Sequence, residues 1–174
     1  MTNKYVDHLQ VLPEDHHNRR MVNGFLLNLG LAYRHIQVFP EAGGWPKVMD
    51  ALTDPAWING LTNYPKRHLL LMIDFDEQVT ARLAQFQNLR AALPAYVQDR
   101  VYLLGCRDEP KVLKAACGLQ LETIGKQLAN DCLQSPANSL WQHAELIHND
   151  AELKRLGAQV RSFLFIGQDR IGGQ

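Results

Sequence analysis

The sequence predicts an α/β fold, with a mostly parallel four-stranded sheet, helices on both faces and a C-terminal helical extension. Short apolar or β-branched segments alternate with helical segments up to about residue 118. One of them, His68 to Ile73, is apolar almost throughout, which is typical of a strand buried on both faces. Strands that alternate with helices favour parallel pairing through right-handed crossovers, and this pattern indicates the fold class.

The expected strands each end at Pro, Asp or Gly. They are Tyr5 to Leu12, His35 to Phe39, His68 to Ile73 and Arg100 to Leu104. Helices are expected between them, at Glu14 to Gly30, Trp45 to Leu52 and Val79 to Leu93. The Pro- and Gly-containing segment from Asp54 to Lys66 is expected to be a loop. After Gly105 the pattern is helical, at Glu109 to Cys117, Leu121 to Cys132, Leu140 to His148 and Ala151 to Phe165.

Composition narrows the class of protein. Lys plus Arg and Asp plus Glu both number 18, which argues against a chain that holds nucleic acid by itself through a strongly basic surface. The three cysteines form no CxxC pair, as expected for reduced thiols in the cytosol. No signal region and no apolar run long enough to cross a membrane are present. We expect a cytoplasmic protein with no membrane partner.

The domain organisation expected from these patterns has three parts. An α/β core occupies residues 1–118, and a helical extension packed on this core occupies residues 119–166. A flexible tail is expected at residues 167–174. The extension carries apolar side chains that are candidates for docking a partner protein. They are Trp141, Leu146, Leu153, Leu156, Phe163 and Phe165.

Acidic side chains follow three of the four expected strands. They are Glu14 and Asp15, then Asp74, Asp76 and Glu77, then Asp108 and Glu109. The carboxyl ends of parallel strands share one edge of the sheet, where α/β folds bind ligands. Asp74 and Asp76 point to the same side of an extended segment. Mg²⁺ prefers carboxylates together with waters and phosphate oxygens, so the pattern indicates a cation site.

Turns and helix caps give each of these acids an alternative role. Asp76 in particular could cap the helix that begins near Val79, and Glu109 lies where an acid favours a helix N-terminus. His16 and His17 lie beside the first acids and could contact a metal or a phosphate, although adjacent side chains on a helix diverge by about 100°. Basic residues near the acids are expected phosphate contacts, namely Lys47, Arg107 and Lys111.

Four segments resemble the motifs of the Toprim domain, and the nearest likeness is to small stand-alone Toprim proteins of the OLD type. QVLPEDHHNRRMVNGFL resembles the first motif, and RHIQVFPEAGGWPKVMDAL resembles the second strand with its Gly-rich turn. HLLLMIDFDE resembles the DxD motif, and VYLLGCRDEPKVLKAACG resembles the later motif in which an acid opens a helix. The likeness covers roughly residues 4–118. Pro13 precedes the first acid and Asp15 follows it in place of Gly, so Glu14 and Asp15 are both open as the first-motif acid, with Glu14 favoured.

This resemblance implies a Rossmann-like Toprim fold and a nuclease subunit that cleaves phosphodiesters with Mg²⁺ or Mn²⁺. Glu14, Asp74, Asp76 and Glu109 would then be the catalytic acids that hold the ion. The implied partners are nucleic acid, in the first place DNA, and a separate ATPase, as in antiviral defence against phage.

Two other functions stay open. The first is a Toprim-like structural subunit that has lost catalysis, which the departures around Glu14 would explain. The second is a receiver-like phosphoacceptor domain with Asp74 as the acceptor. A receiver domain needs a hydroxyl side chain after its fourth strand and a Lys after a fifth strand, and the sequence shows neither.

Overall fold

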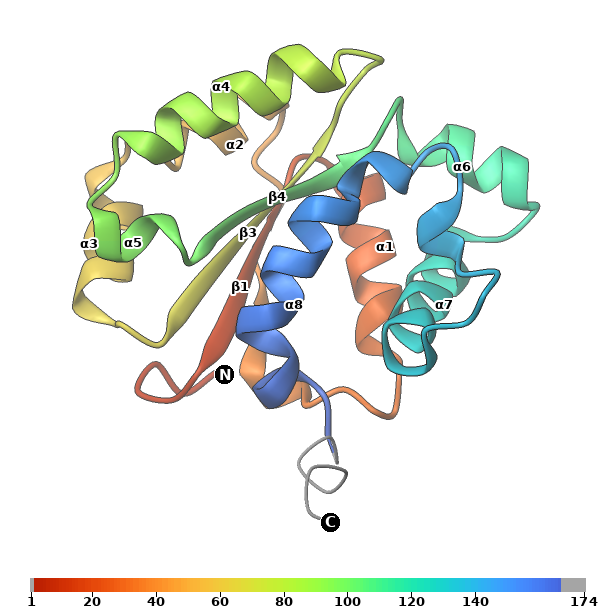
Figure 1. Ribbon diagram of the computed structural model, residues 1–174, viewed down its shortest axis with the longest axis horizontal. Coiled ribbons are helices and arrows are strands. Elements are labelled where there is room, and N and C mark those ends of the chain that lie inside the picture. The colour runs from red at the N-terminus through yellow and green to blue at the C-terminus, as the bar shows by residue number, and fades with distance from the viewer. Residues whose placement is uncertain (1, 167–174) are drawn as a thin grey trace.

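The computed structural model describes residues 2–166, and its strands form one parallel sheet in the order β2-β1-β3-β4 (Figure 1). The strands are β1 His8–Pro13, β2 Ile36–Val38, β3 Arg67–Asp74 and β4 Val101–Cys106. In register, His8 pairs with Arg67 and Asp74 with Cys106, so β1, β3 and β4 end close together at one edge. The α/β class and the four parallel strands expected from the sequence are confirmed.

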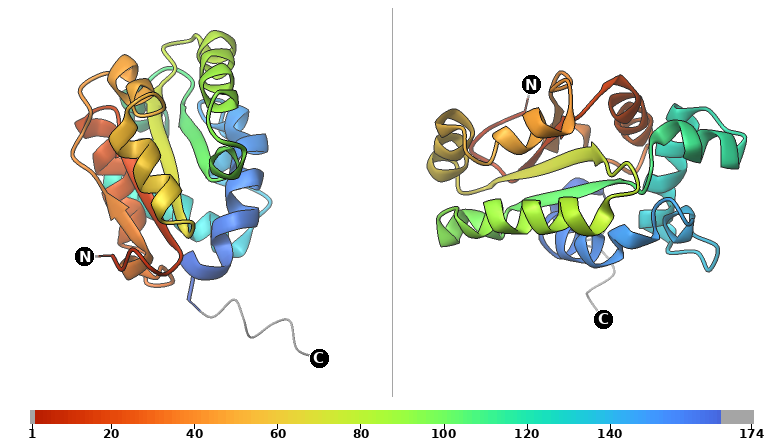
Figure 2. Two further views of the ribbon diagram at one scale, coloured as in Figure 1. Left: turned by 90° about the vertical axis from the view of Figure 1, so that its left-hand side faces the viewer. Right: turned by 90° about the horizontal axis from the view of Figure 1, so that it is seen from above.

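Helices cover both faces of the sheet (Figures 1 and 2). On one face lie α2 Trp45–Asp50, α3 Pro55–Asn63, α4 Val79–Ala91 and α5 Ala95–Gln98. On the other lie α1 His16–Leu26, α6 Pro110–Cys117, α7 Leu121–Gln134 and α8 Asp150–Leu164. Short 3₁₀ turns complete the described chain, at Tyr33–His35, Leu140–Gln142 and Ile147–Asn149.

Alternating side chains of the central strands divide between two apolar cores. Leu70 and Met72 of β3 face the core under α1, α7 and α8, whereas Leu69, Leu71 and Ile73 face the core under α2 to α5. Each fully buried aliphatic side chain stabilises the fold by roughly 1.5–3 kcal/mol. Because the stretch of β3 from Leu69 to Ile73 is covered on both faces, every position in that stretch is apolar, which explains the continuous hydrophobic run.

Two expected elements differ from the structure. The segment expected as a loop contains α3, because Asp54 accepts a hydrogen bond from the Ala56 N–H at 2.8 Å and Pro55 occupies the first turn. The helix expected at Leu140 to His148 is replaced by two short 3₁₀ turns. There the buried Asp131 carboxylate accepts the Leu140 N–H at 2.6 Å, and side-chain bonds of this kind compete with a regular helix.

The C-terminal helices α7 and α8 belong to the helical layer that covers one face of the sheet together with α1 and α6. Helices α1 and α7 meet backbone to backbone, since a Cβ on Gly24 would lie 2.0 Å from the Glu122 carbonyl oxygen and one on Gly125 would lie 1.9 Å from that of Met21. The six apolar residues considered for docking all pack in the core beneath α8. Buried are Leu146, Leu156 and Phe165; half-buried are Trp141, Leu153 and Phe163.

The described part of the chain contains no helix that is both long enough and apolar enough to cross a membrane. The tail expected at residues 167–174 lies outside the described residues.

Candidate functional site

Glu14 and Asp74 meet at the carboxyl edge of the sheet, where the neighbouring strands β1 and β3 end. The Glu14 N–H donates to the Met72 carbonyl at 2.8 Å, which extends the strand pairing by one residue. The Asp74 N–H then donates to Oε2 of the Glu14 side chain at 2.7 Å. The first-strand and third-strand acids expected from the sequence are therefore joined directly, with Asp74 buried and Glu14 half-buried.

Asn18, on the first turn of α1, forms hydrogen bonds with two of the acids at this edge, Asp74 and Asp15. Asp15 is the N-cap of α1 and accepts the Asn18 backbone N–H at 2.9 Å. The fully buried Asn18 amide donates to Asp74 Oδ1 at 2.8 Å and to Asp15 Oδ1 at 3.2 Å, while its own Oδ1 has no hydrogen-bond partner. The sequence reading missed Asn18. The available signal was the position of Asn18 three residues after Asp15, the N-cap acid. At that spacing the Asn18 side chain lies near the strand ends.

The environment shifts the pKa values of these acids. Burial, opposed by the Asn18 hydrogen bond and aided by the charges of Glu14, Asp15 and Asp76, raises the pKa of Asp74 to about 7. Burial also raises the pKa of Glu14, aided by the charge of Asp76 and opposed by the Asp74 N–H. For Asp15, burial would raise the pKa, but the hydrogen bonds from Asn18 and His17 outweigh it and lower the value.

Asp76 is held by Arg82 of α4 and does not cap that helix. The buried guanidinium of Arg82 donates to the Asp74 carbonyl, pairs with the Asp76 carboxylate at 2.7 Å and lies 4.6 Å from the Trp45 ring centroid. The N-cap of α4 is Gln78, with no side-chain capping bond. Arg82 was not anticipated. Arg82 follows Asp74 by eight residues, across the turn from strand to helix, and no sequence motif marks this spacing.

The chain directly after β3 has an unusual backbone. Asp76 and Glu77 both have positive φ values, of 45° and 61°, which L-residues seldom adopt and which concentrate at functional sites. The segment is fixed by the loop after β4, because the Asp76 N–H donates to the Asp108 carbonyl at 3.2 Å and the Glu77 N–H to the Arg107 carbonyl at 2.9 Å. The DxD segment and the fourth-strand loop therefore form one unit.

Glu145 fixes this fourth-strand loop from the other side. It is buried, accepts the Asp108 N–H at 2.9 Å and lies 3.6 Å from the Arg107 guanidinium, which also approaches Glu77 at 3.4 Å. Arg107, expected to contact phosphate, is thus partly engaged within the chain.

Glu109 takes a different position from the one expected. It stands at the N-cap of α6 without a side-chain capping bond, and its carboxylate lies 3.9 Å from the Lys111 ammonium. Within the described residues, this pair is half-exposed, and no hydrogen bond or ion pair joins Glu109 to Glu14, Asp74 or Asp76.

The Gly-rich turn wraps the main chain of Glu14. Gly43 and Gly44, with φ values of 92° and 138°, donate their N–H groups to the Glu14 carbonyl at 2.9 and 3.4 Å. These groups are consequently used within the chain. Lys47 on α2 is exposed, and its side chain lies over Gly43, where an added Cβ would be 3.6 Å from the Lys47 Nζ.

A second group of potential ligands lies beside the first acid. Asp15, His16 and His17 are the described residues whose ligand atoms all lie within 4.8 Å of one another. The two imidazole rings were expected to diverge, yet their centroids are 3.8 Å apart, because His17 turns toward Asp15 at 3.3 Å. Glu14, Asp74 and Asp76 do not meet this close spacing within the described chain.

The chain matches no protein-family model, no curated protein and no solved structure. The likeness to Toprim motifs stays a prediction from the sequence.

Proposed function

We propose that this protein is a Mg²⁺- or Mn²⁺-dependent phosphodiester hydrolase of Toprim-like architecture, acting as a nuclease subunit. The observation that carries the proposal is the direct bond between Glu14 and Asp74 at the carboxyl edge of a parallel sheet, with buried Asn18 against both Asp74 and Asp15. This edge is where ligands bind in such folds.

The donors at this edge fit a hard divalent cation. They are oxygen atoms, the ligand type that Mg²⁺ selects. Glu14 and Asp74 would hold the ion, with Asp76 next to them. A half-turn of the Asn18 amide would present its unpartnered, buried Oδ1 to the same space. An ion there supplies charge stabilisation for a leaving oxygen and lowers the pKa of an attacking water.

The electrostatics of the chain support the same assignment. Burial, together with the charges of Glu14, Asp15 and Asp76, raises the pKa of Asp74, so the charged carboxylate is present at neutral pH only at a cost in free energy. A cation removes that cost. Arg82 meanwhile keeps Asp76 and the Asp74 carbonyl in place. Lys47, Arg107 and Lys111 lie on the loops and helix starts around this edge and would contact a phosphate backbone.

The balanced charge of the chain supports a partner-assisted mode of action. With 18 basic and 18 acidic residues, non-specific affinity for DNA is low. A separate ATPase subunit in the cytoplasm would supply the missing affinity for nucleic acid.

The test combines metal binding with cleavage. Mg²⁺ and Mn²⁺ are titrated calorimetrically into the wild-type chain and into Asp74→Asn and Glu14→Gln. The exposed α2 variant Asp50→Asn serves as the matched control. We expect both site variants to lose at least about tenfold in cation affinity and the control to keep it. Wild-type chain that binds neither ion would refute the proposal.

Cleavage of single- and double-stranded DNA and RNA is then assayed for the chain alone and with any ATPase that is encoded beside its gene. Metal-dependent cleavage that Asp74→Asn abolishes supports the nuclease. Equal cleavage by wild type and Asp74→Asn in the reconstituted complex would show that this chain is not the nuclease.

One observation favours the inactive subunit as the second candidate. The Asp76 carboxylate is neutralised by buried Arg82, which leaves Glu14 and Asp74 as the proposed ligands that form no ion pair within residues 2–166. Under this alternative the complex assembles, and neither Asp74→Asn nor Glu14→Gln changes its activity.

A further inference from the structure

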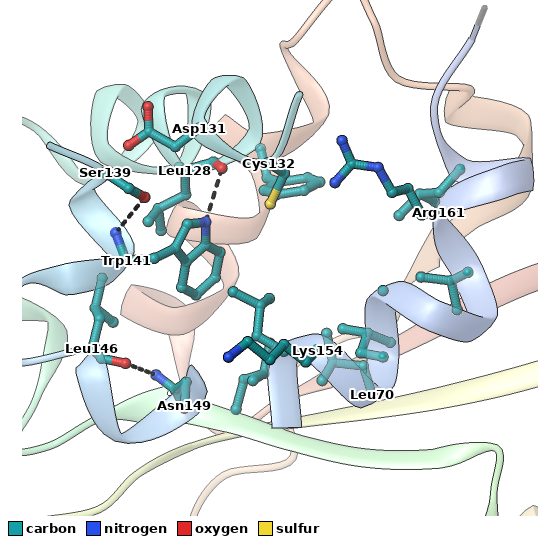
Figure 3. A pocket seen from close by; sticks show the side chains of 18 of the residues that line it. Leu70, Leu128, Asp131, Cys132, Ser139, Trp141, Leu146, Asn149, Lys154 and Arg161 are labelled. Carbon is teal, nitrogen blue, oxygen red and sulfur yellow. Dashed lines mark hydrogen bonds between the residues drawn. The ribbon is translucent and has the colours of Figure 1, made fainter. Parts of the chain in front are cut away.

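An apolar cavity of about 800 Å³ lies between the sheet and helices α1, α7 and α8. Figure 3 shows Leu70 of β3 beside it, Leu128 and Cys132 on the α7 side, and Trp141 and Leu146 on the irregular segment after α7. Helices α1 and α7 pack on each other and α8 packs on β1 and β4, so the space lies between the α1–α7 pair and α8. Small-molecule sites in proteins have volumes of roughly 300–1,000 Å³, and this cavity falls in that range.

The cavity opens to solvent between the loop after α7 and helix α8, because exposed residues of its lining lie on both of these segments. They include Ser135, Pro136 and Ala137 on the loop, and Lys154 and Ala158 on α8. The deeper lining is formed by buried apolar side chains of β1 and β3. A small molecule can therefore reach the apolar interior through this opening while the sheet stays intact.

The polar groups in the walls of the cavity form hydrogen bonds with one another. The Trp141 indole N–H donates to the Leu128 carbonyl at 3.1 Å, and the Asn149 amide donates to the carbonyls of Leu146 at 3.0 Å and Gly105 at 2.9 Å (Figure 3). The Asn149 side-chain oxygen also accepts the Gly105 N–H at 3.1 Å. Buried water needs two to four polar partners, so these walls favour an apolar occupant over ordered water.

The charged residues of the lining are likewise engaged within the fold. The Asp131 carboxylate accepts the Leu140 N–H at 2.6 Å, and the Asp150 carboxylate pairs with the Lys154 ammonium at 2.9 Å. Arg161 also has an interaction of its own within the chain. A charged ligand would therefore lose its hydration in the cavity and would compete with these contacts for a counter-charge.

We propose that this cavity binds a neutral aliphatic molecule, which fills the apolar space in place of water. Protein interiors are close-packed, and the side chains around an unfilled space of this size lose dispersion contacts on that side. A neutral hydrocarbon chain restores these contacts and leaves the hydrogen bonds and ion pairs of the walls intact. The site is separate from the strand-end acids and does not depend on the proposed nuclease function.

The first experiment titrates hexanol, heptanol and octanol, each below its solubility limit, into the whole chain by calorimetry. We expect saturable binding, with an affinity that rises roughly fourfold for each added CH₂ group, as for a chain that leaves water completely. Octanoate and octylammonium carry a chain of the same length with a negative or a positive charge, and they should bind no more tightly than octanol. The absence of saturable octanol binding, or an affinity independent of chain length, would refute the site. Tighter binding of either ion would show that the ligand is not neutral.

The second experiment locates the ligand through methionine methyl groups. Met21 and Met72 line the cavity, whereas Met49 lies in the core on the opposite face of the sheet. In NMR spectra of the whole chain labelled at its methionine methyls, saturating octanol should shift the signals of Met21 and Met72 and leave that of Met49 in place. Saturable octanol binding that leaves Met21 and Met72 unchanged would place the ligand elsewhere.

A cavity-filling variant completes the test. Gly157 of α8 lines the cavity, and a Cβ added there meets nothing within 4 Å. Gly157→Phe should therefore fold and lose at least about tenfold in octanol affinity, because its ring occupies the space of the ligand. Gln159→Phe, on the exposed face of the same helix, is the matched control and should keep the affinity. Full octanol affinity in a folded Gly157→Phe chain would exclude the cavity as the site.

Discussion

The backbone N–H of Asp74 donates a 2.7 Å hydrogen bond to the side chain of Glu14, so the acid that follows β1 completes the hydrogen bonding at the end of β3. Glu14 therefore has a structural contact in addition to its proposed role at the cation. The two roles can be separated, because a glutamine keeps the acceptor oxygen and removes the charge.

Glu14→Gln and Glu14→Ala should differ in stability but not in cation binding. We expect both to weaken Mg²⁺ binding. Glu14→Ala should lose about 1–3 kcal/mol in free energy of unfolding, because the half-buried Asp74 N–H loses its partner, whereas Glu14→Gln should stay close to wild type. Urea unfolding with and without Mg²⁺ measures both effects. Equal stability of the two variants would show that the bond contributes nothing.

The stability of the protein should decrease as the pH rises through the titration of Asp74. Its pKa is raised from 3.8 to about 7 in the folded chain, mainly by burial. A raised folded pKa favours folding while the group stays protonated in the native state, and this contribution is lost between about pH 4 and pH 7. Asp74→Asn should flatten that slope, by on the order of 1 kcal/mol per pKa unit. Urea midpoints across this range test it, and an unchanged slope in the variant would contradict the assignment.

Mg²⁺ should oppose the same pH effect. A cation at Asp74 favours the charged carboxylate and lowers its pKa. In saturating Mg²⁺ the wild-type stability should therefore fall less steeply with pH. Asp50→Asn should follow the wild type in both conditions, since Asp50 is exposed on α2.

Arg82→Met should destabilise the chain and release Asp76. Loss of the buried guanidinium leaves the Asp74 carbonyl without this donor, at a cost of about 1–3 kcal/mol, and leaves the exposed Asp76 carboxylate without its cation. Arg90→Met, a half-buried arginine on the same helix, should cost much less. Thermal unfolding compares the two. Similar losses of stability in the two variants would mean that the Arg82 contacts stabilise the fold no more than those of Arg90.

The contact between α1 and α7 should tolerate no side chain. Gly125→Ala places a Cβ against the Met21 carbonyl and should destabilise by about 1–3 kcal/mol. Gly157→Ala, in the middle of α8 with open space around it, should instead stabilise by up to about 1 kcal/mol through helix propensity. Chemical denaturation of the two variants gives opposite signs if the geometry is right.

Glu109→Gln should leave both stability and Mg²⁺ affinity nearly unchanged. The side chain makes no capping bond and forms one half-exposed ion pair with Lys111, which contributes at most about 1 kcal/mol. A large loss of Mg²⁺ affinity would restore Glu109 to the ligand set that the sequence motif implies.

The strands were predictable because hydrophobicity alone identifies them. A strand segment buried on both faces, such as Leu69 to Ile73 of β3, needs an apolar residue at every position, and the chain order then limits the topology. The meeting of Glu14 and Asp74 followed from the rule that parallel strands end at one edge.

Contacts between distant segments were not predictable. Arg82, Glu145 and Asn18 fix the strand-end loops through tertiary contacts, and nothing in their local sequence shows which partner each one finds. The prediction of a helix at residues 140–148 was wrong for the same reason. Its helical spacing is overruled by the Asp131 carboxylate, which lies nine residues before Leu140.

The packing of α8 against β1 also bears on synthesis at the ribosome. Strand β1 emerges well before α8, which packs on one of its faces, and Ala32 in turn donates its N–H to the Leu164 carbonyl at 2.7 Å. Leu9 and Val11 therefore stay open to water until α8 has left the exit tunnel. A nascent chain halted before Asp150 would expose this half of the sheet, which makes it a natural client for chaperones that bind apolar segments.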